Sequence, residues 1–433
     1  MQQAITRTIH AYHPNTVLTP SAFVLSDHLY ATNDAQGQTV FFDFANQSEA
    51  TIMLSVAGFS GAGVARHVRS SSPERSSTST PRSMLSMTSA ASMLEDGDHQ
   101  PVEKEPASEG ILKIIDHVHL QHDILCCKYS EDGSMIAVGL KDGSIKVFSS
   151  ETGAQLYNLV DSETKESHLP CTSLNFRHHL DGDKSQNVLL ATYASGMVKL
   201  WHTASRQCLH TIHEPRQTLA AAFDVTTSLF VTTGSDEKVF IYDANTTQIV
   251  NTCQPSPSMG VMDGHRSRVF CVKFHPRNVK EFVTGGWDDT IQFWDTREEH
   301  ATRRIYGPHI CGDALDIDPV HDHILTGSWR KTNSLQIWDY ASGSCVKSVP
   351  SVPGDIDSLI YCTQWLGKEH IVAGGCDANM VRLIDRGTFK TTGRIVDLSR
   401  GVYCLHSNPV GTSRRFAIGF SSSLLFLQIK PTM

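Results

Sequence analysis

The C-terminal three-quarters of this 433-residue chain is built from one repeated unit. Each unit closes an apolar stretch on a pair of residues that lies 41 to 53 residues after the previous pair. The seven closing pairs are Phe148-Ser149, Trp201-His202, Tyr242-Asp243, Trp294-Asp295, Trp338-Asp339, Ile384-Asp385 and Leu427-Gln428. A period of about 40 to 50 residues indicates an array of supersecondary units, none of which can bury its apolar face alone.

The fourth unit is the most complete and shows how the others are organised. An apolar stretch from Val269 to Phe274 is followed by a His-Pro-Arg-Asn turn and a second stretch that ends at Gly286. A turn that begins at Trp287 then leads into a third stretch that closes on Asp295. Short apolar runs bounded by turn residues predict three β-strands. With Gly-His upstream, the unit resembles a WD repeat, which forms one blade of a β-propeller.

The resemblance implies a hydrogen-bonded clamp that ties the turns of a blade to its third strand. His265, Asp288 and Trp294 match the His, Asp and Trp that the family uses. The family's Ser or Thr partner, two residues before the Asp, is replaced by Gly286, so we expect an incomplete clamp. The turn Asp of the first and third units is matched by Asp142 and Asp236.

One position in the first strand of every unit carries a small residue. These residues are Cys126, Ser173, Ala220, Cys271, Ala314, Cys362 and Cys404. The innermost strands of a propeller crowd together at the central channel, where bulky side chains would not fit. We therefore expect these four cysteines, among the eleven in the chain, to be small buried residues rather than metal ligands or disulfide partners.

The number of predicted strands indicates how the array closes. The last unit reaches its third strand near Ile429, a few residues before the chain ends, and an orphan apolar strand, Ile111–Leu120, precedes the first unit. Pairing these two segments would complete the last blade and remove the exposed sheet edges. The sequence therefore predicts an all-β fold, a seven-bladed WD-repeat β-propeller over residues 111–433.

Two segments precede the predicted ring. Residues 1–60 are expected to form a small β-rich extension, with a hairpin between strands at Ala22–Leu25 and Thr39–Phe44. Residues 61–110 are rich in Ser and Thr and then acidic, which predicts a disordered linker. Ser72 and Thr80 each precede a proline and are candidate sites for proline-directed kinases; the alternative is a solvated tether without a switch.

Composition narrows the class of protein and its partners. The formal charge of −8 does not favour nucleic-acid binding. No apolar run approaches the ~18 residues of a membrane span, and no secretory signal is recognised. Eleven cysteines without a CxxC pair favour a reducing compartment, so we expect a cytoplasmic protein, with the nucleus as a further location.

No catalytic motif is recognised, so we expect a protein that is not an enzyme and needs no cofactor or metal. The first functional hypothesis is a scaffold or adaptor that binds other proteins or peptides in a multiprotein complex, with its oligomeric state undetermined. The alternative is a substrate receptor of a cullin–RING ubiquitin ligase. The Trp294–Arg297 segment resembles the WDxR motif of such receptors, with Arg297 as the adaptor contact.

A candidate binding surface lies on the turns before the clamp aspartates. Trp287 and Trp329 occupy equivalent turn positions in the fourth and fifth units, and turns of this kind open onto the top face of a propeller. The basic residues expected around them are Arg266, Arg268, Arg330 and Lys331. Such a surface is typical of a pocket for a peptide with apolar and acidic residues. The alternative is that each tryptophan folds over its own blade and shields the channel.

Overall fold

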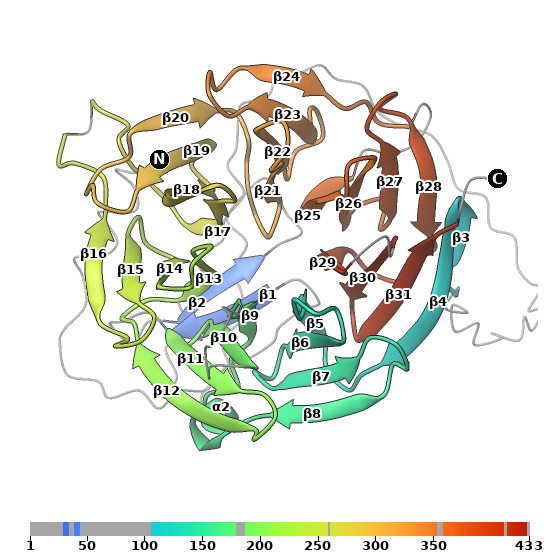
Figure 1. Cartoon of the computed structure of the whole chain (residues 1–433), viewed down its shortest axis with the longest axis horizontal. Helices are drawn as coiled ribbons and strands as arrows, with labels where there is room; N and C mark the ends of the chain where they lie inside the picture. The colour runs from blue at the N-terminus through green and yellow to red at the C-terminus, as the bar shows by residue number, and fades with distance from the viewer. Residues whose placement is uncertain are drawn as a thin grey trace, which may run out of the picture.

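Seven antiparallel sheets stand around a common centre in the computed structural model of the chain (Figure 1). The structure describes residues 29–33, 39–43, 105–178, 187–258, 260–352, 358–410 and 414–430. The predicted seven-bladed propeller is confirmed. In each blade the first strand lies nearest the axis and the fourth strand lies on the outside (Figure 1).

The blades are numbered in chain order. Blade one contains β5 (Ile124–Tyr129), β6 (Met135–Leu140), β7 (Ile145–Ser149) and β8 (Gln155–Leu159). Blade two contains β9 (Cys171–Phe176), β10 (Val188–Tyr193), β11 (Met197–His202) and β12 (Gln207–His213). Blade three contains β13 (Thr218–Phe223), β14 (Leu229–Gly234), β15 (Val239–Asp243) and β16 (Ile249–Cys253). Blade four contains β17 (Val269–His275), β18 (Asn278–Gly286), β19 (Thr290–Asp295) and β20 (Arg303–Tyr306).

The remaining blades follow the same order. Blade five contains β21 (Leu315–Ile317), β22 (His323–Gly327), β23 (Leu335–Asp339) and β24 (Cys345–Ser348). Blade six contains β25 (Leu359–Leu366), β26 (His370–Cys376), β27 (Val381–Asp385) and β28 (Thr391–Val396), with β3 (Ala107–Gly110) as a fifth strand. Blade seven contains β29 (Val402–Ser407), β30 (Arg415–Phe420), β31 (Ser423–Ile429) and β4 (Leu112–His119).

Burial is greatest in the two middle strands of a blade and lowest in the outer strand. The second strand β10 is buried at all six positions, because its blade is packed on both faces by neighbouring blades. The outer strand β24 is exposed at all four positions. The apolar runs in the sequence are therefore the middle strands, and the outer strands mark the edge of the ring.

The small residues of the first strands pack against glycines of the second strands. The pairs in register are Cys126 with Gly139, Cys271 with Gly285, Cys362 with Gly374 and Cys404 with Gly419. A Cβ atom at Gly139 would lie 2.5 Å from the sulfur of Cys126 and 2.7 Å from that of Cys171. The four cysteines are buried, and all eleven cysteines are free thiols within the described residues.

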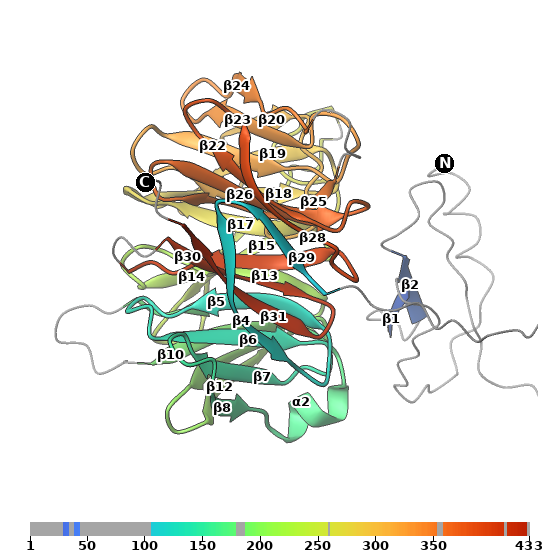
Figure 2. The same cartoon turned by 90° about the vertical axis from the view of Figure 1, so that its right-hand side faces the viewer.

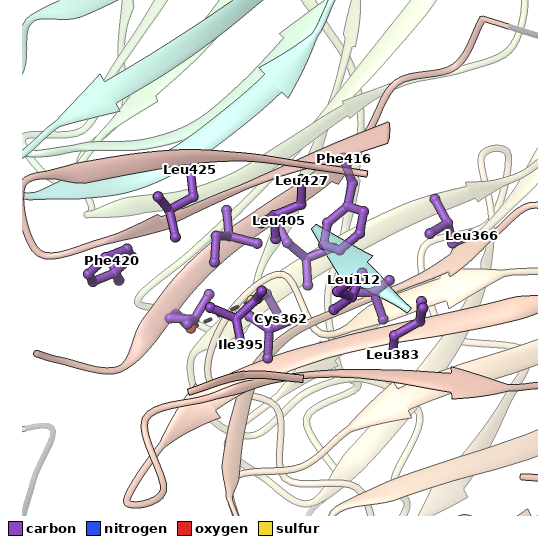
Figure 3. Close-up of a cluster of buried hydrophobic side chains, with 14 of the residues drawn as sticks. Leu112, Cys362, Leu366, Leu383, Ile395, Leu405, Phe416, Phe420, Leu425 and Leu427 are labelled. Carbon is purple, nitrogen blue, oxygen red and sulfur yellow. Dashed lines mark hydrogen bonds between the residues drawn. The ribbon is translucent and has the colours of Figure 1, made fainter. Parts of the chain in front are cut away.

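Ring closure uses a strand from before the first blade. β4 pairs antiparallel with β31, with Leu112 opposite Ile429 and His119 opposite Ser423, as the orphan strand predicts. Leu112 is completely buried and projects among residues of blades six and seven, including Leu383, Ile395 and Phe416 (Figure 3). Burying one such leucine contributes roughly 1.5–3 kcal/mol, in addition to the backbone hydrogen bonds of the paired strands.

The predicted linker is too long at its C-terminal end. Residues Ala107–Gly110 form β3, which pairs with β28 through Val396 to Gly393 and carries an ion pair of 2.6 Å between Arg394 and Glu109. β3 and β4 run along the outside of the last two blades (Figure 2). A main-chain ladder can order an acidic segment that has little to bury, which composition does not reveal.

An N-terminal hairpin is present, with a different first strand from the predicted one. β1 (Leu29–Asn33) pairs with β2 (Thr39–Asp43). The predicted first strand, Ala22–Leu25, lies outside the described residues. So do residues 44–104, which include Ser72, Thr80 and most of the predicted linker.

One short helix lies between blades one and two. α2 (Ser162–Ser167) is capped by Asp161, whose carboxylate accepts a hydrogen bond of 2.9 Å from the backbone N–H of Thr164. The same carboxylate lies 2.7 Å from Nζ of the buried Lys199 and neutralises it. No helix among the described residues is long and apolar enough to span a membrane.

Two truncations that differ by one strand test the closure. Removing residues 1–119 leaves β31 without its partner, so we expect loss of soluble monomer. Removing residues 1–110 takes away β3 but keeps β4, and this control should stay monomeric and melt within a few degrees of the full chain. The measurements are soluble yield, size-exclusion chromatography and thermal melting. Equal melting temperatures for the two truncations would show that β4 does not hold the ring together.

Candidate functional site

A buried hydrogen-bond relay joins the turns of blade four to its third strand. The ring of His265 lies 2.9 Å from Oδ2 of Asp288 through Nδ1 and 2.6 Å from the hydroxyl of Thr284 through Nε2. Nε1 of Trp294 donates to the same hydroxyl at 2.7 Å. Oδ1 of Asp288 accepts from the hydroxyl of Thr290 at 2.7 Å, which fixes the turn.

The prediction of an incomplete clamp is wrong. Thr284 supplies the hydroxyl. It lies two residues before Gly286, the position at which the family pattern has Ser or Thr. Gly286 cannot carry a side chain, because a Cβ there would lie 2.4 Å from the carbonyl oxygen of Arg268. Burial alone would raise the pKa of Asp288, but the hydrogen bonds from His265 and the neighbouring backbone hold it below its usual value.

Blade three makes the same connection with other residues. Glu214 accepts hydrogen bonds from the hydroxyl groups of Thr232 and Tyr242, at 2.5 and 2.8 Å. Arg216 donates from Nε to Glu214 at 2.7 Å and from Nη1 to Asp236 at 2.6 Å. Tyr242 stands where blade four has its tryptophan, and the Glu–Arg pair takes the place of the histidine.

Six first strands share a β-bulge at the same level of the ring. The register skips one residue in each of β5, β9, β13, β17, β25 and β29. The skipped residues, with Asp313 at the equivalent place in blade five, form what we call the bulge ring: Leu125, Thr172, Leu219, Phe270, Asp313, Tyr361 and Tyr403. All seven line a cavity of about 180 Å³ at the centre of the propeller. A bulge turns one side chain out of the alternation, here into the channel.

The aromatic residues of the bulge ring meet the predicted tryptophans. The centroid of Phe270 lies 5.5 Å from that of Trp287, and Tyr361 lies 6.3 Å from Trp329 and 5.2 Å from Tyr403. Nε1 of Trp287 donates to the sulfur of Cys311, another residue of the cavity wall, at 2.8 Å. The channel mouth therefore has an aromatic border over blades four to seven.

The two tryptophans are placed differently. Trp329 is 8% exposed and packs in a buried cluster with Cys311, Leu359 and Tyr361. Trp287 is half-buried, and the ring of His309 stacks on it at 6.0 Å. Trp329 therefore forms part of the floor, as the packing alternative expects, whereas Trp287 keeps a surface open to solvent.

Three of the four predicted basic residues belong to this border. The guanidinium of Arg268 lies 5.3 Å from the centroid of Trp287. Nη2 of Arg330 lies 2.8 Å from Oδ1 of Asp289, which also lies 2.7 Å from Nδ1 of His309. Lys331 is exposed beside them. Arg268 therefore faces Trp287 directly, and Arg330 and Lys331 follow Trp329 on the neighbouring turn of blade five.

Arg266 does not belong to the border. Its Nη2 atom donates to the carbonyl oxygens of Ser256, Ser258 and Val261, at 3.2, 3.1 and 2.9 Å. The side chain therefore anchors the inserted loop before blade four.

Comparisons with known proteins agree with this geometry. Residues 256–295 match the model of the WD domain, G-beta repeat, and residues 110–179 match that of the anaphase-promoting complex subunit 4 WD40 domain. The chain is a WD-repeat protein. It resembles a striatin homolog of Dictyostelium discoideum, 23% identical over 46% of this chain and 24% of that protein. It also resembles WD repeat-containing protein 1 of Xenopus tropicalis, 24% identical over 51% of this chain and 35% of that protein.

A third relative is a guanine nucleotide-binding protein subunit beta-like protein of Encephalitozoon cuniculi. It is 23% identical over 30% of this chain and 38% of that protein. This WD-repeat protein therefore spans about a quarter to two-fifths of the length of these relatives. Such propellers are generally non-catalytic scaffolds that bind other proteins in complexes.

Arg297 lies at the opposite end of blade four from Trp287. Trp287 precedes β19 and Arg297 follows it, so the two turns open onto opposite faces of the ring. Nε and Nη2 of Arg297 donate to the carboxylate of Asp295 at 2.8 and 2.6 Å, and this contact holds the pKa of Asp295 below its usual value. The arginine of the WDxR motif is thus paired within its own turn.

Asp142 also fixes the turn of its blade. Its Oδ1 atom accepts from the backbone N–H and the hydroxyl of Ser144, at 3.0 and 2.8 Å, and His122 lies 3.5 Å from Oδ2. No cluster of three His, Cys, Asp or Glu side chains suited to a metal ion occurs among the described residues.

Replacing Thr284 by valine tests the relay of blade four. Valine keeps the shape and removes the hydroxyl, which leaves the N–H of Trp294 and one nitrogen of His265 buried without a partner. We expect a loss of ~1–3 kcal/mol in the free energy of unfolding. Trp294→Ala should cost more, roughly 3–5 kcal/mol, because it also leaves a cavity.

Thr152→Val, on an exposed turn, is the matched control and should stay within about 0.5 kcal/mol of the wild type. Denaturant unfolding followed by tryptophan fluorescence measures all three variants. A loss for Thr284→Val no larger than that of the control would mean that the relay contributes nothing to stability.

Proposed function

We propose that this protein is a non-catalytic scaffold that binds partner peptides on the propeller face that carries Trp287. The observation that supports the proposal is the half-buried indole at the channel mouth, packed on an aromatic floor and faced by the guanidinium of Arg268. Tryptophan and arginine are the residues that most often dominate interface energetics. An apolar side chain of the peptide would cover Trp287, and acidic side chains would meet Arg330 and Lys331.

The rigidity of the floor favours binding over packing alone. Trp329 and Tyr361 are held between blades and are 8% and 4% exposed, so they lose little freedom when a peptide arrives. Trp287 is fixed by its hydrogen bond to Cys311 and by the stack with His309. A preorganised aromatic surface has a smaller entropic cost of binding than a flexible one.

Alanine substitutions separate the two tryptophans. Trp287→Ala should weaken capture of co-purifying proteins by ~2 kcal/mol or more while the melting temperature changes little. Trp329→Ala should lower the melting temperature, because it removes a buried aromatic and roughly 3–5 kcal/mol of stability. Tyr306→Ala is the control, because Tyr306 is a 57% exposed aromatic residue on the outer strand of blade four.

Affinity capture with quantitative mass spectrometry and thermal melting measure these effects. If Trp287→Ala loses stability and keeps the partners of the wild type, the indole is packing and the binding surface lies elsewhere.

The ligase-receptor alternative rests on Arg297. Its side chain is 63% exposed although it pairs with Asp295, so a surface for an adaptor would have to include this exposed turn. Under this alternative, Arg297→Ala would abolish capture of a cullin adaptor and leave the ring folded. Capture of the same adaptor by wild type and variant would remove the reason to consider it.

A further inference from the structure

A second ring of side chains lies below the bulge ring in the channel. Each first strand contributes one residue, two positions beyond the small residue and at the same register against the second strand. We call this set the polar ring: Lys128, Asn175, Ala222, Lys273, Asp316, Gln364 and His406. Six of the seven are polar, which is unusual for the innermost strands of a packed fold.

Most polar side chains of this ring have a partner. Lys273 lies 2.7 Å from Oδ1 of Asp313, and Asp316 accepts from the backbone N–H of Trp365 at 2.9 Å. Asn175 donates to the carbonyl oxygen of Ala221 at 2.7 Å. Two further bonds complete the set: Gln364 accepts from the N–H of Ser407 at 2.8 Å, and His406 accepts from that of Tyr129 at 3.2 Å.

Lys128 is the exception. It lines the central cavity, and its ammonium group has no hydrogen bond or ion pair with any of the described residues. The charged and titratable groups around it are Lys273 on β17, Asp313 and Asp316 at β21, His406 on β29 and Cys127 beside it. Burial and the charge of Lys273 lower the pKa of Lys128 to about 8. A partly buried cation without a partner is costly, and an anion that reached it would remove that cost.

The route to Lys128 passes the surface to which we assign peptide binding. The same cavity is lined near its mouth by Phe270, Cys311, Tyr361 and Tyr403, and deeper by Lys128 and Lys273. Its volume of about 180 Å³ suits a single extended side chain and not a folded element. Aromatic walls with one unpaired cation at the end match a side chain that has an apolar stem and a charged tip.

We infer that the channel is a pocket for one acidic side chain, Glu or Asp, of a bound peptide, whose carboxylate pairs with the ammonium group of Lys128. The inference rests on the proposed function, because the peptide backbone must lie across the mouth beside Trp287. Acidic residues that contact Arg330 or Lys331 at the border are separate from this one. Lys273 pairs with Asp313 beside the pocket, and Asp316 accepts from the N–H of Trp365, so the ammonium group of Lys128 is left without a partner among the described residues.

The experiment uses a displayed library of random twelve-residue peptides, selected on the full-length protein. Each selected peptide is synthesised with every acidic residue changed in turn to its amide, and affinities are measured against wild type and Lys128→Met. We expect one Glu→Gln or Asp→Asn change to weaken binding about tenfold or more, and Lys128→Met to weaken the acidic peptide equally. The amide peptide should bind wild type and Lys128→Met alike, so the two changes are not additive.

Proton uptake gives a second measurement. A carboxylate beside Lys128 favours its charged form and raises its pKa, so binding at pH 8 should take up protons. Calorimetry in buffers of different ionisation enthalpy measures this uptake, which should vanish for the amide peptide. Lys113→Met, on the exposed outer strand β4, controls for the loss of one positive charge. If Lys128→Met does not fold, the peptide-side changes and the proton uptake still decide the result.

The outcomes separate the two proposals. In one outcome, peptides lose affinity with Trp287→Ala and keep the same affinity with Lys128→Met and after every amide substitution. This result would overturn the pocket and leave the proposed binding face intact. An acidic residue that still matters in Lys128→Met pairs at the border, which also overturns the pocket. Peptides indifferent to Trp287→Ala, or a selection that yields none, would overturn the binding face and the pocket together.

Discussion

The close approach of backbones at the axis is the constraint on which the rest of the propeller depends. A cysteine of a first strand lies against a glycine of the second strand in four blades, so little space remains between adjacent sheets. Where the small residue is Ser173 or Ala220, the partner in register is a threonine instead. The combined volume of the two paired side chains thus stays small. This volume sets how tightly seven blades can pack around one channel.

The clamp shows that different blades of one ring can hold their own strands and turns together with different residues. Blade four has the full relay through Thr284, whereas in blade five Trp338 donates to Thr326 at 2.9 Å. Blade three substitutes a buried Glu214–Arg216 pair. What these three blades share is a hydrogen-bonded polar group on the third strand, since an unpaired one would cost about as much as the relay contributes.

Sequence periodicity predicted the architecture well because each blade must bury a repeated apolar pattern. The closing pairs, the small residues and the orphan strand at Leu112 follow directly from that need. The clamp partner Thr284 was missed because one family spacing was applied where the strand register decides the contact. The bulge ring was missed because a skipped residue leaves no mark in an apolar run, and Lys128 stands out only when seven strands are compared. Main-chain pairing of the acidic strand β3 leaves no compositional signal.

The pairing of β4 with β31 also constrains how the protein is made. The two strands that complete blade seven are separated by the six other blades, so β4 must wait for β31, the last strand to be made. During synthesis the apolar face of β4, including Leu112, has no permanent partner while each following blade forms. Contacts between segments so distant in sequence slow folding and lead to aggregation-prone intermediates. A nascent ring of this kind is therefore prone to aggregation for almost as long as its own translation takes.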